Sequence, residues 1–362
     1  MIRQAGAPLR APAVDRQYNG DSIMRYGKAL IAAAASSLLL GVSAPAISAE
    51  KRTLCVFDII GTSGDMYNIM RDYRTAAIEQ GYDLELKAYT DENIAAEDLK
   101  AGQCDAAAIT GIRGRQFNSY TGSLDSIGAI PDYDALRTVV QVLASESPRI
   151  TPNLRSGSYE VMGIAPMGAA YLFVKDQAIN NVNALAGKSI AVMEYDAAQG
   201  KMAASVGMSP VMSDITNFAG RFNNHSVDIC FAPVMAYSAL ELYKGMEPNG
   251  GIVDYVLGQL TLQVIARHNK FDSEFAAWSR SYFFNSVFDR AMRIINSANN
   301  EIEDKWWIEI AEQDKLRYDE MMRDARIELT EQGIYNKDMM SLLRNIRCRL
   351  DAARAECSDQ RE

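Results

Sequence analysis

The sequence predicts an α/β protein in which two doubly wound lobes face each other across a cleft and long helices follow. Strand-like and helix-like segments alternate between residues 52 and 110, and the alternation returns between residues 160 and 243. From residue 272 onward the apolar spacing is helical throughout. Because strands that alternate with helices form parallel sheets, we expect a ligand site beyond the carboxyl ends of the strands.

The amino-terminal segment has the order of a secretory signal peptide. A basic start at residues 24–28 precedes an apolar run at 29–42, and small residues continue to Ala49, where we expect cleavage. A run of about 14 residues is shorter than the ~20 that cross a bilayer, which disfavours the alternative of an uncleaved anchor. We therefore interpret residues 24–49 as the signal peptide and residues 1–23 as an upstream extension.

Charge excludes several classes of partner. The chain carries a formal net charge of −9, and since residues 1–49 contribute +3, residues 50–362 carry −12. Such a chain repels nucleic acid and anionic lipid head groups. No second apolar run approaches a spanning length, so we expect no stable membrane insertion after cleavage. We expect the chain to be a monomer in the periplasm.

The first lobe is expected over residues 50–150. Its elements are a strand at 53–59, a helix at 65–80, a strand at 84–89, a helix at 93–101 and a strand at 104–110. Gly102 is the natural end of the second helix, because glycine adopts the left-handed conformation that closes helices.

The second lobe is expected over residues 151–270, after a Pro- and Ser-containing stretch at 145–158. Its elements are strands at 160–164, 171–175, 189–193 and 227–231, with helices at 199–206 and 235–243. Helices are then expected from 272, from 300 to 331 and from 337 to about 355, with Gly333 as a stop. This region, 271–362, is expected to pack on the lobes and bridge them.

A row of mainly aromatic residues in the carboxy-terminal region permits two structural interpretations. Helical spacing relates Trp306, Trp307, Ile310 and Tyr318. This spacing fits either a ligand-binding cluster or ordinary packing in the hydrophobic core. We favour the core, because apolar side chains at this spacing usually face a protein interior.

The five cysteines fit an oxidising compartment. Cys55 and Cys104 open two predicted strands and could meet if those strands are neighbours, although two buried free thiols are an equal alternative. Cys348 and Cys357 could pair if a turn follows the helix that holds the first of them. Cys230 is then the candidate for the unpaired thiol.

Several short segments, taken in order, resemble one family. Residues 98–107 combine a helix, a Gly-x-x-Asp turn and a strand, and residues 182–192 combine Leu-x-Gly-Lys with a strand. Residues 206–211 form a Gly-x-x-Pro-Val segment, and residues 224–229 are similar to a Gly-x-Val-Asp strand entry with His225 in place of the glycine. Together they resemble the extracytoplasmic solute-binding subunits of TRAP transporters, over nearly all of residues 52–335.

This resemblance implies a periplasmic-binding-protein-like fold, capture of a small-molecule solute, delivery to the membrane subunits of a transporter, and no cofactor. The chain also resembles a divergent subgroup of solute-binding proteins, some of which are labelled as parts of multidrug efflux systems. One position departs from the family: Ala191 stands where the family commonly carries an arginine that clamps a substrate carboxylate. The ligand therefore stays unidentified.

Candidate ligand contacts in the first lobe follow its strands. Asp58, Thr62 and Ser63 lie in a glycine-containing loop before a helix, where they either bind a polar group or cap the helix. Tyr89 follows the second strand. Arg113 and Arg115 follow the third strand and either replace the missing carboxylate clamp or pair with nearby acids at the surface. These six residues are predicted ligand contacts, and each alternative is compatible with the sequence.

The second lobe contributes five further candidates. Glu194, Tyr195 and Asp196 follow the strand that contains Ala191, where carboxylates suit a cationic or hydroxyl-rich ligand or form an exposed turn. Pro233, in the segment 231–233, and Tyr237 follow the next strand, where Phe231 and Tyr237 would add an aromatic wall and a hydroxyl; the alternative for Tyr237 is packing between helices. We expect ligand binding to favour a closed form of lobes hinged near residues 148–157.

The sequence disfavours an enzyme. The chain has two histidines, His225 and His268, and neither belongs to a grouping with metal-ligand spacing. It also contains neither a Gly-x-Ser-x-Gly nucleophile elbow nor a phosphate loop. We expect no catalytic residue, no metal and no cofactor. The alternative function is a non-enzymatic envelope adaptor or efflux-associated protein that docks through its helices.

Overall fold

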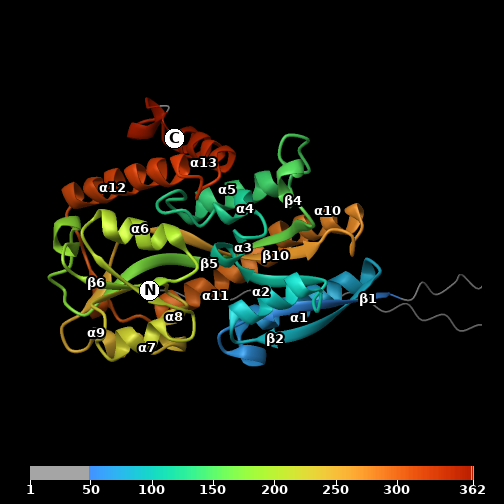
Figure 1. Cartoon of the computed structure of the whole chain (residues 1–362), viewed down its shortest axis with the longest axis horizontal. Helices are drawn as coiled ribbons and strands as arrows, with labels where there is room; N and C mark the ends of the chain where they lie inside the picture. The colour runs from blue at the N-terminus through green and yellow to red at the C-terminus, as the bar shows by residue number, and fades with distance from the viewer. Residues whose placement is uncertain (1–48, 360, 362) are drawn as a thin grey trace, which may run out of the picture. The chain divides into compact units, whose positions relative to one another are not determined.

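The computed structural model describes residues 49–359 and 361, so the predicted upstream extension and nearly all of the predicted signal peptide lie outside it. Within these residues, a mixed sheet runs through the centre in the order β2-β1-β3-β10-β5-β8-β6-β7 (Figure 1). The strands are β1 (Glu50–Phe57), β2 (Tyr82–Tyr89), β3 (Ala106–Thr110), β4 (Arg155–Ser156), β5 (Tyr159–Val174), β6 (Ser189–Met193), β7 (Ser209–Ser213), β8 (Ile229–Pro233), β9 (Gly251–Val253), β10 (Gly258–Arg267) and β11 (Trp307–Ile308).

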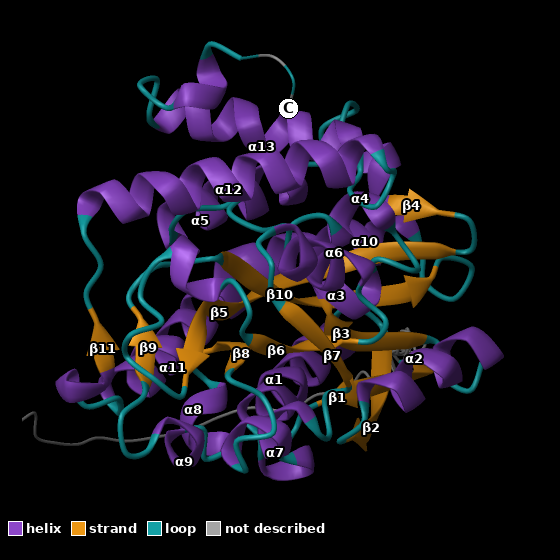
Figure 2. Cartoon of the chain, turned by 60° about the vertical axis from the view of Figure 1, so that its left-hand side comes forward, coloured by secondary structure: helices purple, strands orange, loops and turns teal. Residues whose placement is uncertain are grey.

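Helices cover both faces of this sheet (Figure 2). They are α1 (Asp65–Glu79), α2 (Glu92–Ala101), α3 (Gly111–Gly114), α4 (Ser119–Gly122), α5 (Tyr133–Ala144), α6 (Ala197–Ser205), α7 (Phe218–Asn223), α8 (Ala236–Ala239), α9 (Tyr243–Met246), α10 (Ser273–Tyr282), α11 (Phe288–Asn300), α12 (Glu312–Glu331) and α13 (Lys337–Leu350). No helix among the described residues is long and apolar enough to cross a membrane.

The two ends of the sheet are parallel, as predicted, but its centre is antiparallel. β1 pairs in parallel with β2 and β3, and β6 pairs in parallel with β7 and β8. Between these ends, β10 runs antiparallel to both β3 and β5, and β5 runs antiparallel to β8. The central pair therefore joins the two parallel parts into one sheet.

The prediction of two strands at 160–164 and 171–175 was wrong, because β5 is one continuous strand. Pro166 and Gly168 resemble strand breakers in the sequence, but they lie where the pairing with β10 shifts register at Leu260 and Thr261. Gly168 has a φ of +105° there, a backbone conformation that glycine adopts without a Cβ clash. A bulge thus absorbs both residues without ending the strand.

The helices also differ from expectation in places. The predicted helix at 235–243 is broken into α8 and α9, because Glu241 has a left-handed backbone with a φ of +53°. The predicted start of a long helix at residue 300 is also wrong, since β11 lies between α11 and α12. Gly102, by contrast, ends α2 with a φ of +78°, as predicted.

Strand alternation places apolar side chains on both faces of the sheet. Leu54 and Val56 of β1 pack with α1, α10 and α11, whereas Cys55 and Phe57 pack with α2, α5 and α13. The residues Trp306, Ile310 and Tyr318 are buried in the core. The sheet is therefore covered on both sides, which explains why its central strands β5 and β10 are buried along nearly their whole length.

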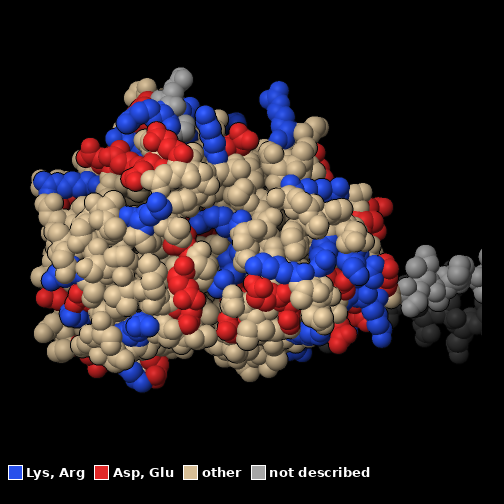
Figure 3. Space-filling view, in the orientation of Figure 1, with Lys and Arg blue, Asp and Glu red and all other residues tan. Residues whose placement is uncertain are grey.

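The carboxy-terminal helices contact both parts of the sheet layer. α12 lies against α6, and α13 lies against α4 and α5. Disulfides join Cys55 to Cys104 and Cys348 to Cys357, with Cα atoms 5.9 and 5.4 Å apart, and Cys230 is a buried free thiol. Acidic and basic side chains intermingle on the surface over α12 and α13 (Figure 3).

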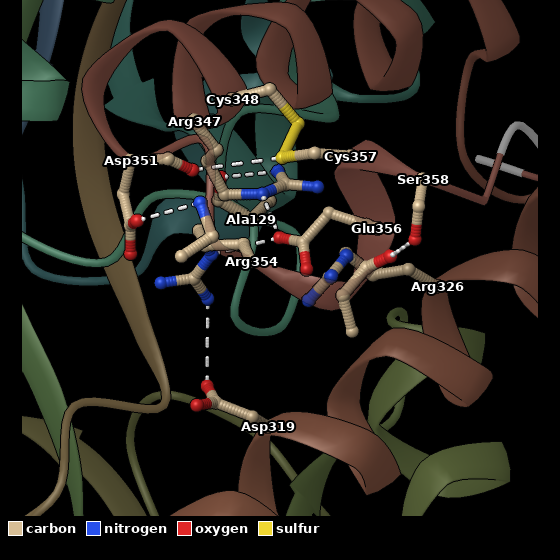
Figure 4. Close-up of polar contacts among 12 residues, drawn as sticks. Ala129, Asp319, Arg326, Arg347, Cys348, Asp351, Arg354, Glu356, Cys357 and Ser358 are labelled. Carbon is tan, nitrogen blue, oxygen red and sulfur yellow. Dashed lines mark hydrogen bonds and ion pairs between the residues drawn. A yellow bond between two sulfur atoms is a disulfide. The ribbon is translucent and has the colours of Figure 1, made fainter.

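A network of charges holds the chain after α13. The carboxylate of Glu356 accepts hydrogen bonds from Arg347 at 3.0 Å and Arg354 at 2.9 Å, beside the Cys348–Cys357 disulfide (Figure 4). Arg347 also donates to the carbonyl of Ala129 at 2.7 Å. Burial alone would raise the pKa of Glu356, but the hydrogen bonds from the two arginines lower it to about 2.

Candidate ligand-binding site

An apolar cavity of about 150 Å³ lies at the carboxyl ends of β1, β3 and β8. Its wall combines loops that follow these strands with residues from β10, the bulge of β5 and the helices α1, α7 and α8. The lining residues are Phe57, Asp58, Ile59, Ile60, Asp65, Met66, Thr110, Met167, Ile215, Phe218, Pro233, Met235, Ala236, Ala239, Leu240 and Leu260. Most of these side chains end in carbon or sulfur.

Asp58 fixes the loop on one side of the cavity. Its buried carboxylate accepts hydrogen bonds from the backbone N–H of Ile60 at 2.9 Å and of Tyr67 at 3.1 Å, so it also caps the first turn of α1. Gly64 is required beside it, because a Cβ at that position would lie about 2 Å from the carboxylate atoms. Asp58 thus borders the cavity while its oxygens are engaged by backbone.

A charged cluster lies next to the cavity, at the end of β3. The guanidinium of Arg113 lies 3.3 Å from the ring centroid of Tyr195, and its Nε is 3.8 Å from the carboxylate of Glu92. The hydroxyl of Tyr195 donates to Glu92 at 3.1 Å, and the backbone N–H of Thr110 donates to Glu92 at 2.6 Å. Burial raises the pKa of Glu92, and the contacts with Thr110 and Arg113 oppose that increase.

Arg115 forms the second half of this cluster. It lies 2.7 Å from the buried carboxylate of Asp196 and donates to the carbonyl of Gly122 at 3.0 Å. Asp196 also accepts the backbone N–H of Ala198 and caps α6. Arg113, Arg115, Tyr195 and Asp196 together border an open groove of about 300 Å³, which we call the charged groove.

A buried acid lies behind the groove. Asp125 accepts hydrogen bonds from the hydroxyl of Thr261 at 2.6 Å and from its backbone N–H at 3.1 Å. Burial raises the pKa of Asp125 to about 7, and the bonds from Thr261 oppose the increase. Gly111 makes room for this pair, since a Cβ there would lie 2.4 Å from the Thr261 hydroxyl oxygen.

The remaining predicted contacts are spread over several environments. Thr62, Ser63 and Glu194 are exposed. The hydroxyl of Tyr89 donates to Asp98 at 2.5 Å. Pro233 lines the cavity, and Tyr237 of α8 is buried in a core cluster with residues of α7. The structure thus brings Asp58 and Pro233 to the cavity, and it brings Arg113 and Arg115 to Tyr195 and Asp196 in the groove.

Sequence reasoning did not identify most of the cavity wall. Ile215, Phe218, Met235 and Leu260 line it without having been singled out. Met235 follows a predicted strand end, so its position carried a usable signal, whereas Leu260 belongs to β10, a strand that was not predicted. Ala191 is buried in the same cluster as Phe218, against which Ile215 and Met235 also pack, but it is not among the residues that line the cavity.

Solved structures share the fold. A TRAP periplasmic solute-binding protein from Desulfovibrio salexigens, with bound orotic acid, superposes with a TM-score of 0.69 at 12% identity, covering 83% of this chain and 99% of that one. Another, from Shewanella oneidensis with bound succinate, gives 0.65 at 12% identity over 82% and 98%. These matches confirm the predicted α/β fold of the TRAP solute-binding class, including its long carboxy-terminal helices.

Sequence relatives are closer. The chain is 43% identical over 303 residues to the probable solute-binding protein AdeT1 of Acinetobacter baumannii, covering 84% of this chain and 99% of the relative. It is 27% identical over 236 residues to probable solute-binding protein AdeT2 of the same organism, covering 65% and 98%. Both relatives are described as probable solute-binding proteins, the class of non-enzymatic protein that the sequence predicted for this chain. The family model for solute-binding protein AdeT 1/2 matches residues 75–362, and the chain belongs to this family.

Proposed function

We propose that this chain captures a small molecule in the apolar cavity, between a first lobe at residues 50–150 and a second lobe at 151–270, and delivers it from the periplasm to the membrane subunits of a TRAP-type transporter. The observation that carries the proposal is the composition of the cavity wall. Phe57 and Thr110 come from strand ends of the first lobe, and Phe218 and Pro233 come from the second. A ligand held there contacts both lobes at once.

The charged groove supports the same proposal, because it supplies contacts that hold the lobes together. Arg113 stacks on Tyr195, and Arg115 pairs with Asp196, so each contact joins the end of β3 to the segment after β6. A ligand that fills the cavity adds to these contacts and favours the closed arrangement. Closure then presents one composite surface to a membrane partner.

A matched pair of variants tests whether the cavity is the binding site. Ala236→Trp fills the apolar cavity, whereas Ala197→Trp introduces the same side chain at the charged groove. Purified residues 50–362 are screened by thermal shift against fractionated small-molecule extracts of the host bacterium. A ligand at 100 times its dissociation constant stabilises a protein by about 2.7 kcal/mol.

The proposal predicts that a stabilising fraction acts on the wild type and on Ala197→Trp but not on Ala236→Trp. Circular dichroism verifies that each variant is folded, and Leu260→Phe is a second cavity-filling change in case the first disturbs α8. If no fraction stabilises the wild type, or if both cavity-filling variants respond like the wild type, the cavity is not the binding site and the proposal is wrong.

A further inference from the structure

We propose that the cavity selects an apolar, ring-sized ligand that carries no negative charge, with a neutral or cationic polar end near Asp58 and Asp65. This inference rests on the proposed function and names the class of ligand. It separates the chain from the structural neighbours named above, whose bound molecules are orotic acid and succinate. Four observations support it.

The first observation is the charge of the wall. Among the described residues that line the cavity, Asp58 and Asp65 are acidic, and lysine, arginine and histidine are absent. Asp58 is only 5% exposed, so its charge is weakly screened by solvent. An anionic ligand would have to lose its hydration beside these carboxylates without gaining a cation.

The second observation is that the nearest candidate cations have other partners. Arg115 is held by Asp196 and the carbonyl of Gly122, and Arg113 is held between Glu92 and the ring of Tyr195. Both side chains border the charged groove instead of the cavity. Releasing either one toward a ligand would leave a buried carboxylate, Asp196 or Glu92, without its counter-ion.

The third observation is the place of Ala191. Its side chain is buried in an apolar cluster with Phe218, and Ile215 and Met235 pack against this cluster. These three residues line the cavity, whereas Ala191 does not. The alanine at this position therefore brings no cation to the cluster that contributes Phe218 to the cavity wall.

The fourth observation is size and adaptability. A cavity of about 150 Å³ is large enough to hold a benzene-sized molecule. Met66, Met167 and Met235 contribute flexible, polarisable side chains to the wall. Such side chains adjust to an apolar ring and also make favourable contacts between sulfur and the ring. The wall thus suits an aromatic or compact aliphatic body better than a hydroxyl-rich acid.

Three probes that share one ring test the inference: benzylamine, benzyl alcohol and benzoate, which are cationic, neutral and anionic at pH 7. Affinities are measured by isothermal titration with residues 50–362, the cavity-filling Ala236→Trp and Leu260→Phe, and the groove control Ala197→Trp. We expect benzylamine and benzyl alcohol to bind at least tenfold more tightly than benzoate. We also expect both cavity-filling variants to lose this binding and Ala197→Trp to keep it.

The outcomes separate this inference from the proposed function. If benzoate binds as tightly as benzylamine, and the cavity-filling variants lose this binding, the inference is overturned. The cavity is then still the binding site. Benzoate binding that disappears in Arg115→Ala but survives cavity filling assigns acids to the charged groove and also overturns the inference. If none of the three probes binds and the extract screen is silent as well, the proposed function fails together with the inference.

Discussion

The apolar cavity and the charged groove are linked through Thr110 and Glu92 but are built in opposite ways. Thr110 lines the cavity, and its backbone N–H donates to Glu92 beside the groove. In the groove, Arg113, Arg115 and their acidic partners satisfy one another within the chain. In the cavity, the walls are mostly apolar and leave space for another molecule. The difference suggests that the charges hold the fold, whereas the uncharged space is free for a ligand.

The largest expected change in unfolding free energy follows from breaking the Arg115–Asp196 ion pair of the charged groove. Arg115→Ala leaves the buried carboxylate of Asp196 without its cation, which typically costs about 3–5 kcal/mol of unfolding free energy. Urea denaturation measures the change. The double variant Arg115→Met with Asp196→Leu is the control, because it removes both charges and is expected to recover most of the loss. A single variant as stable as the wild type would show that the pair has no structural role.

The next largest expected change is a dependence of folding stability on pH that comes from Asp125. Because the pKa of Asp125 is raised to about 7 in the folded chain from a usual 3.8, the folded state binds this proton more tightly than the unfolded state. The stabilisation is complete below pH ~4 and is lost as the pH rises through 7. We expect the wild type to lose roughly 2–4 kcal/mol relative to Asp125→Asn between pH 4 and pH 8.

Urea denaturation of both proteins across this range gives the difference. Asn keeps the shape of the acid and resembles its protonated form, so the effect of the variant on stability should grow with pH. A difference between the two proteins that is constant with pH would contradict the raised pKa.

At the charge network after α13 we expect stability to change with pH in the opposite direction and by a smaller amount. The pKa of Glu356 is lowered to about 2 from a usual 4.5, so its ionised form is favoured by folding. This stabilisation is present above pH ~4.5 and is lost as the pH falls toward 2, by about 1–2 kcal/mol after allowance for solvent screening. Glu356→Gln should lower stability at pH 6 and change it little near pH 2. An equal loss at both pH values would argue against the ionised network.

The smallest expected change in stability comes from Tyr195, and it tests whether the groove and the cavity act independently. Tyr195→Phe removes the hydroxyl that donates to Glu92 and keeps the ring under Arg113, so we expect a loss of about 1 kcal/mol in stability. Binding of benzyl alcohol should be unchanged within twofold, because Tyr195 does not line the cavity. A tenfold loss of that affinity in isothermal titration would show that the two regions are coupled.

Sequence patterns predicted the parts of the fold that have local signals. The parallel ends of the sheet follow from alternating strands and helices, and Gly102 marks the end of α2. β5 was missed as one strand because Pro166 and Gly168 act as breakers in most contexts, and only the antiparallel partner β10 makes them a bulge. β10 itself alternates Gln259, Leu260 and Thr261 in the pattern of a strand, so its signal was present.

The candidate site was harder to predict, because it depends on which segments meet in space. Placing residues at strand ends identified Asp58 and Pro233 of the cavity and the charged residues that line the groove, but not Glu92, the partner of Arg113. Spacing alone does not reveal that Arg115 faces Asp196, about eighty residues away in the sequence. The departure at Ala191 was visible in the sequence, and in the structure this alanine is buried in the apolar cluster that contributes Phe218 to the cavity wall.

The most direct test of the central claim is a crystal structure of residues 50–362 with 4-bromobenzylamine, whose bromine is located by anomalous scattering. The account predicts one bromine site inside the cavity, between Phe57, Met167 and Met235, with the amine toward Asp58. A bromine site in the charged groove beside Arg115, with the cavity empty, would contradict it.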